Sequence, residues 1–121
     1  MQTANLQSHA AAASTLLKAL SNERRLVILC HLAAGERSVG ELERLVGLSQ
    51  SALSQHLARL RRDHLVSTRR SAQTIYYSLT SEAAKTVLTT LDQLYSGRHQ
   101  PNGSAGKDSS RAAGNGRVRA A

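Results

Sequence analysis

The chain is poor in the residues that cross-link or fill a large core. Its 121 residues include one Cys and neither Phe nor Trp. A single cysteine excludes a disulfide within the chain, and a core without large aromatics buries modest apolar area, so association with a second copy would help a domain of this size. No stretch approaches the ~20 apolar residues of a membrane span. We therefore expect one small domain that does not cross a membrane.

Motifs for catalysis and for metal binding are also missing. There is no Gly-rich phosphate loop, no H-E-x-x-H and no nucleophile elbow. The five histidines are scattered, and the neighbours Cys30 and His31 point about 100° apart around a helix, so they do not converge on one ion or substrate. We expect neither an enzyme nor a metal site, and no cofactor is implied.

Acidic residues are few, 8 against 16 Lys and Arg, which gives a formal charge of +8. Residues 49–73 hold five Arg and one Asp, whereas the rest of residues 1–96 holds six cations and six acids. The excess charge of the folded part thus lies in one segment, which favours an anionic partner there. The other +4 comes from residues 97–121, a Gly-, Ser-, Ala- and Arg-rich stretch that we predict to be a disordered basic tail.

Local signals predict two helices between residues 38 and 63. Ser38 and Glu41 form an S-x-x-E capping box, which marks a helix start, and Gly47 is the residue type found just past a helix end. Ser49 is a good N-cap for a second helix over residues 49–63. Its apolar stripe, at i, i+4 and i+7, consists of Leu53, Leu57 and Leu60. Two helices joined by a short turn with Gly are typical of a helix-turn-helix.

The side of the second helix opposite the leucines is amide-rich and cationic. Gln can pair with adenine, Arg can bind guanine or phosphate, and Ser can reach base edges or phosphate. These residue types therefore suit a helix in the major groove of DNA. A solvated surface without a ligand is the alternative. The candidate DNA-binding residues of this helix are Ser49, Gln50, Ser51, Ser54, Gln55, Arg59 and Arg62.

A β-hairpin is predicted after this helix. Leu65–Arg70 and Gln73–Leu79 are rich in β-branched and aromatic residues, and Ser71 and Ala72 separate them. The polar residues at the tip are Arg69, Arg70 and Gln73. Cations on such a hairpin suit contact with phosphate or the minor groove, which would make residues 65–79 the wing of a winged helix. The turn lacks the usual Gly or Asn, which leaves its length open by a residue or two.

These segments together resemble the ArsR (ArsR/SmtB) family of bacterial transcriptional repressors. The resemblance rests on GLSQSALSQHLARLRRDHLV followed by TRRSAQTIYYSL and covers about Leu16 to Tyr95. It implies a winged helix-turn-helix, mainly α with a small β-hairpin (α+β), in the order of four helices, two strands and one helix. His64 stands where many members have Gly, and His tolerates the left-handed conformation better than most residues.

The resemblance also implies how the protein works. Members are homodimers that pair through their first and last helices, here about residues 9–20 and 81–95, and bind double-stranded promoter DNA at an inverted repeat until a chemical signal releases it. By this carry-over the helix contacts bases or nearby phosphates, and the wing contacts the backbone or minor groove. We expect a flexible N-terminus over residues 1–8 and a DNA-binding and dimerisation domain over residues 9–96. We also expect a cytoplasmic protein, because the start of the chain is a poor signal peptide with Lys18 in its apolar stretch.

Cys30 is the candidate sensor. One helical stripe holds Leu26, Leu29, Cys30 and Ala33, which predicts that Cys30 points inward, as a small hydrophobe or as a reactive thiol. The surrounding NERRLVILCHL resembles the BigR, SqrR and YgaV group of the family, with HlyU as a relative. That group senses persulfides or oxidants through two cysteines. Cys30 matches the first, and Ser96 stands near the place of the second.

Ser96 leaves three explanations open: an engineered Cys-to-Ser variant, a natural one-cysteine member, or a loss of redox sensing. A lone thiolate could still become a persulfide, a sulfenic acid or a mixed disulfide. We therefore expect a repressor that reactive sulfur species or oxidants release through Cys30. The alternatives are a repressor without a redox response and a winged-helix module that binds protein. A steep fall of the affinity for DNA with salt would distinguish either kind of repressor from the protein-binding module.

Overall fold

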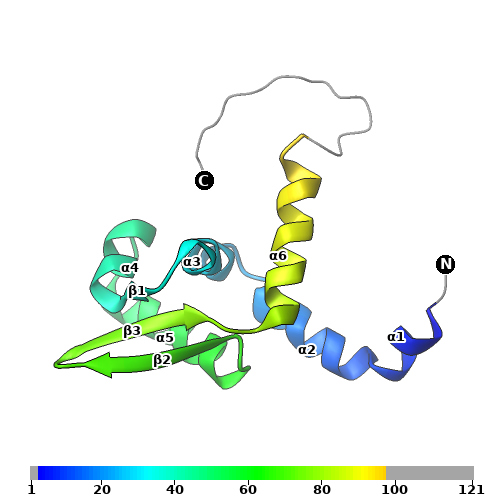
Figure 1. Ribbon diagram of the computed structural model, residues 1–121, viewed down its shortest axis with the longest axis horizontal. Helices are drawn as coiled ribbons and strands as arrows, with labels where there is room; N and C mark the ends of the chain where they lie inside the picture. Colours follow the sequence, from blue (N-terminus) through cyan, green and yellow to red (C-terminus); the bar gives the residue numbers. More distant parts are fainter. Residues whose placement is uncertain (1–2, 98–121) are drawn as a thin grey trace. The chain divides into compact units, whose positions relative to one another are not determined.

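The computed structural model describes residues 3–97 (Figure 1). In chain order the elements are α1 (Ala4–Ser8), α2 (Ala10–Leu20), α3 (Glu23–Ala34), β1 (Arg37–Ser38), α4 (Val39–Val46), α5 (Gln50–Arg62), β2 (Val66–Ser71), β3 (Thr74–Leu79) and α6 (Glu82–Tyr95). The chain divides into two units, one ending at Lys85 and one beginning at Thr86 with the rest of α6. The predicted tail, residues 97–121, lies outside the described residues apart from Gly97.

The predicted order of elements is confirmed except at two places. The first is the additional short, exposed helix α1 (Ala4–Ser8), which lies within the segment predicted to be a flexible N-terminus. The expected two-stranded hairpin gains β1, which pairs with β3, so the sheet is antiparallel in the order β1-β3-β2. A strand of two residues is too short to show a period of two in the sequence. The class remains α+β, with a winged helix-turn-helix.

The turn between α4 and α5 forms as its capping residues predict. The Ser38 Oγ accepts a hydrogen bond from the Glu41 N–H at 3.1 Å, and the Glu41 carboxylate accepts one from the Ser38 N–H at 2.7 Å. Gly47 ends α4 at φ 76°, where a Cβ would be strained. The Ser49 Oγ then caps α5 by accepting from the Ala52 N–H at 3.2 Å. These local bonds set the angle at which α5 leaves the turn.

The core lies where α3, α4 and α5 meet β3. Its buried side chains are aliphatic throughout: Ala19, Leu20, Ile28, Leu29, Leu32, Leu42, Val46, Leu53, Leu57, Leu60, Leu65, Val66, Leu79 and Ala84. No polar or charged residue among the described ones is buried. The leucine stripe predicted for α5 is confirmed, and it directs the opposite side of that helix outward.

The inward placement predicted for Cys30 is wrong, because its side chain is exposed on α3. The buried residues of this helix are Ile28, Leu29 and Leu32. The run from Leu26 to Leu29 is wholly apolar, so two overlapping stripes fit the helical period equally well. Packing against α4, α5 and β3 selects the stripe that leaves Cys30 on the surface.

His64 holds the left-handed position that closes α5, at φ 63°. The Leu65 N–H donates to the Leu60 carbonyl at 2.9 Å and the His64 N–H to the Arg61 carbonyl at 3.0 Å. This is a Schellman motif, and the buried Leu60 and Leu65 supply the apolar contact that accompanies it. The turn from the helix into the wing therefore depends on a residue that carries a Cβ in a strained conformation.

His64→Gly is expected to raise the free energy of unfolding by about 0.5–1 kcal/mol, because Gly adopts positive φ without steric cost and this gain exceeds its larger unfolded-state entropy. Urea unfolding followed by circular dichroism measures the change. His64→Ala, which keeps the Cβ, is the control and should not stabilise. Equal midpoints for the Gly and Ala variants would show that the backbone conformation at residue 64 carries no strain.

Candidate nucleic-acid interface

The outward side of α5 is polar along most of its length. Of the residues predicted to read DNA, those that lie exposed on this helix or at its N-cap are Ser49, Gln50, Ser51, Ser54, Gln55 and Arg62. The buried Leu53, Leu57 and Leu60 anchor the helix from the other side. Since packing uses one face only, the exposed face is free to meet a ligand in a fixed orientation.

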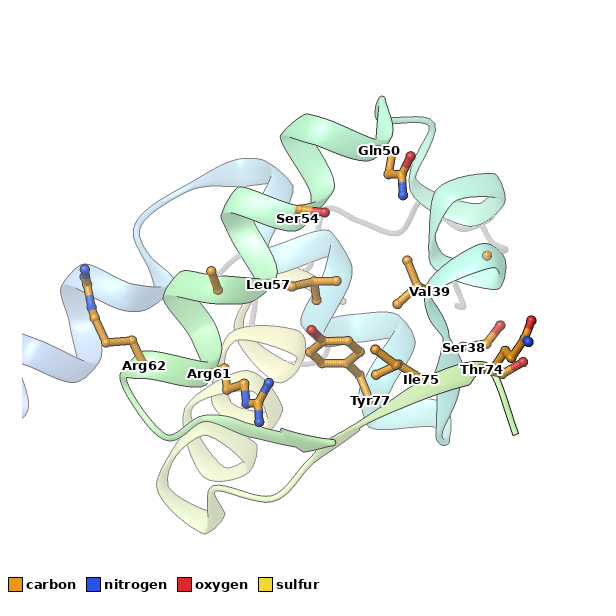
Figure 2. Close-up of a pocket in the computed structure, with 13 residues that line it drawn as sticks. Ser38, Val39, Gln50, Ser54, Leu57, Arg61, Arg62, Thr74, Ile75 and Tyr77 are labelled. Carbon is orange, nitrogen blue, oxygen red and sulfur yellow. The ribbon is translucent and has the colours of Figure 1, made fainter. Parts of the chain in front are cut away.

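A groove runs between α5, the start of α4 and the hairpin (Figure 2). Its volume is about 850 Å³. Leu57, Ile75 and Tyr77 form its apolar floor, and polar side chains from three elements surround them. The polar lining residues include Ser38, Gln50, Ser54, Arg61, Arg62, Gln73 and Thr74. The groove thus joins Gln50, Ser54 and Arg62 of α5 to Gln73 at the tip of the wing. The predicted residues Ser51 and Gln55 do not line it.

Arg61 belongs to this groove although it was not among the predicted residues. Arg61 directly follows Leu60 and flanks the leucine stripe, so it does not lie on the face opposite the leucines, where the sequence places the DNA-binding residues. Its spacing was informative, because Arg61 lies seven residues after Ser54 and therefore on the same side of the helix. With Arg62 it brings two exposed guanidinium groups to the C-terminal end of α5.

The hairpin turn is one residue later than expected. Ser71 pairs with Thr74, which leaves Ala72 and Gln73 as the two-residue turn instead of Ser71 and Ala72. Ala72 adopts φ 56°, a conformation that the usual Asn or Gly would hold more easily. The shift places Gln73 in the turn itself, where it lines the groove.

The two wing arginines differ in their partners. The Arg69 Nε and Nη2 each donate to an oxygen of Glu36 at 2.8 Å, and the Arg69 Cζ lies 4.4 Å from the centre of the Tyr76 ring. The hydrogen bond from Arg69 is the main cause that lowers the pKa of Glu36 and keeps this carboxylate ionised. Arg70 is exposed, and among the described residues it takes part in no ion pair.

Arg59 is tied to its own helix. Its Nε donates to Asp63 Oδ2 at 2.8 Å, and this bond is the main cause that lowers the pKa of Asp63. The side chain of Arg59 is 32% exposed, against 68% for Arg62, whose Nε lies 3.7 Å from the same carboxylate. Arg62 is therefore the more accessible of these two predicted contacts.

The predicted sensor positions lie in different units of the chain. The Cys30 thiol is exposed on α3 in the first unit. Ser96 is exposed just after α6 in the second, where its Oγ donates to the Gln93 carbonyl at 3.3 Å. Within residues 3–97, no group of three or more His, Cys, Asp and Glu side chains could hold a metal ion, and no helix has the length and hydropathy needed to cross a membrane.

Comparison with known proteins gives consistent matches. Residues 22–68 match the model of a family described as bacterial regulatory protein, arsR family. The transcriptional activator HlyU of Vibrio cholerae is 54% identical over 95 residues, which are 78% of this chain and 88% of that protein. The HTH-type transcriptional regulator YgaV of Escherichia coli is 47% identical over 95 residues, 78% of this chain and 96% of that protein.

A solved structure has the same fold. The transcriptional repressor BigR from Xylella fastidiosa superimposes with a TM-score of 0.75 at 39% identity and covers 78% of this chain and 97% of its own. The similarity therefore extends over the helix pair, the wing and the flanking helices together.

Proposed function

Because this chain belongs to the arsR family of bacterial regulatory proteins, we propose that it is a homodimeric repressor whose α5 and wing bind an inverted-repeat operator. The family match confirms the resemblance noted in the sequence. The expectation of a regulator and not an enzyme is also confirmed, since the relatives are named as a transcriptional activator and a transcriptional regulator. The observation that carries the proposal is the groove that joins the polar face of α5 to the wing. Repression follows if a dimer on promoter DNA excludes polymerase.

The proposed contacts divide by chemistry. Gln50, Ser54 and Gln55 are exposed amides and a hydroxyl at the N-terminal half of α5, the end that enters the major groove in helix-turn-helix proteins. They would read base edges, with Ser49 and Ser51 beside them. The guanidinium groups at the other end of the helix and on the wing would bind phosphates. These cations are Arg61, Arg62 and Arg70, and Gln73 would accompany them at the wing tip.

A dimer would account for apolar surface that the chain leaves exposed. Leu6 and Leu17 are each 57% exposed, and both line a shallow groove along α1 and α2. In α6, Leu94 is 46% and Tyr95 is 76% exposed. We propose that these helices pair with those of a second copy. A two-fold dimer would place two α5 helices about one DNA turn apart, which an inverted repeat requires.

The test is a binding titration on DNA. Selection from a pool of random duplexes identifies the preferred sequence, and titration against increasing salt then compares it with unselected duplex. A protein that neutralises several phosphates shows a steep linear fall of log K with log salt. We expect that fall together with selection of an inverted repeat. A flat salt response, or no enrichment of any sequence, contradicts the proposal.

Arg70→Ala is expected to weaken binding to operator and random duplex alike and to reduce the salt slope by about 0.9 per protomer, or about 1.8 for the dimer, because each wing loses one phosphate contact. Arg24→Ala removes the same charge from an exposed position on α3, outside α5 and the wing, and serves as the control. If Arg70→Ala and Arg24→Ala change the slope equally, Arg70 acts only through net charge and makes no phosphate contact.

We also propose that Cys30 receives the signal. Its exposure supports this role, because a thiolate must be reached before it reacts. The Cys30 thiolate would attack the outer sulfur of a hydropersulfide, forming a Cys30 persulfide and expelling the donor thiolate, so no separate oxidant is needed. The new group on α3 would then lower the affinity of the dimer for its operator.

Cys30→Ser is expected to abolish the response to a persulfide donor while leaving operator affinity before treatment unchanged. Operator titrations before and after treatment measure this, with mass spectrometry of the Cys30 peptide in the wild type. Ser96→Cys is the companion variant, and a larger response there would identify a two-thiol sensor that lacks its second thiol. An unchanged response in Cys30→Ser removes Cys30 from the mechanism.

A further inference from the structure

Arg69 points to the side of the sheet that faces away from the groove. Neighbouring residues of a strand alternate between the two faces, and directly paired residues share a face. Arg70 pairs with Ile75, which lines the groove, whereas Arg69 pairs with Tyr76 on the opposite face. The groove side of β2 therefore carries Arg70, and the charge of Arg69 lies behind the sheet.

On that outer face Arg69 is held by Glu36, a residue 33 positions earlier that precedes β1. Both Glu36 oxygens accept from the guanidinium at 2.8 Å, and the Ser78 Oγ donates to the same carboxylate at 3.4 Å. The guanidinium also stacks on Tyr76. A bidentate pair with an aromatic support has a defined geometry, unlike most single-contact surface ion pairs.

We infer that Glu36 limits the affinity of the wing for DNA of any sequence, because it pairs with Arg69, withholds that charge from DNA phosphate and leaves Arg70 as the cation of the wing. This inference rests on the proposed DNA binding. Phosphate contacts strengthen binding to every sequence, whereas base contacts strengthen binding to the operator alone. A neutral pair on the wing therefore lowers the affinity for operator and random duplex by the same factor, while the base contacts set the ratio between the two affinities.

A charge-conserving cycle tests this role. Glu36→Gln is expected to tighten binding to operator and random duplex alike and to make the salt slope steeper by about 0.9 per protomer, or about 1.8 for the dimer, because Arg69 of each wing becomes available for one phosphate. Arg69→Gln should weaken both, because Glu36 is then an unpaired anion beside the DNA. The double variant Glu36→Gln with Arg69→Gln removes the neutral pair as a unit and should bind like the wild type.

The double variant decides between the inference and direct contact. If Arg69 itself bound phosphate, the double variant would be weakened about as much as Arg69→Gln, and this result would overturn the inference. The exchanged pair, Glu36→Arg with Arg69→Glu, is a second check that keeps the ion pair and should also match the wild type; weakened binding there, with an unchanged urea midpoint, would count against the inference. Absence of DNA binding by the wild type would instead overturn the proposed function, and the inference with it.

Discussion

Leu57→Ala is expected to lower the free energy of unfolding by about 2–5 kcal/mol, a large part of the stability of a domain of this size. Leu57 is 2% exposed at the centre of the α5 stripe, and its edge forms part of the floor of the groove. Truncation removes buried methyl groups and leaves a cavity that the surrounding helices fill only in part.

Urea unfolding measures this loss, with Leu45→Ala as the matched control. Leu45 lies on α4 and is 46% exposed, so the same truncation there should cost far less. Similar midpoint shifts for the two variants would mean that Leu57 is not a core residue and that α5 is anchored in another way.

Gln55→Ala is expected to cost about 1–3 kcal/mol of binding free energy per half-site of the operator and little on random duplex. Gln55 is exposed on the side of α5 opposite the buried leucines, so its substitution removes no core packing. A bidentate pair between this amide and an adenine would disappear in the variant, and the base preference at that position would relax.

Titrations on the selected operator, on single-base variants of it and on random duplex separate these effects. Gln93→Ala removes an exposed amide of the same kind from α6, and it should leave all affinities unchanged once size-exclusion chromatography has shown that the variant has the oligomeric state of the wild type. Equal losses on operator and random duplex for Gln55→Ala would show that this side chain contributes general affinity and reads no base.

The parts of the fold that were predicted correctly depend on short-range bonds. The Ser38 and Glu41 capping box, the left-handed Gly47 and the Ser49 cap each act within a few residues of the chain, so a local pattern contains all the information. His64 was expected to tolerate positive φ, and the Schellman motif at the end of α5 uses it in that way.

The parts that were missed depend on distant residues. The pairing of Arg69 with Glu36 joins positions 33 residues apart, and only the antiparallel sheet brings them together. Cys30 was misplaced because the apolar residues of α3 cover more than one face, and the neighbouring elements decide which face is buried. Arg61 was omitted because it borders the buried stripe, where a helical projection alone does not separate a groove residue from a core residue.

The division of α5 into a leucine side and a polar side also bears on how such a protein can diversify. Stability resides in Leu53, Leu57 and Leu60, whereas the proposed base readers share none of that packing. After gene duplication, a copy could therefore exchange its amides and hydroxyls, acquire a new target sequence and keep its fold throughout. Different residues of the helix determine the fold and the proposed target sequence, so members of such a family can come to bind different promoters through surface substitutions alone.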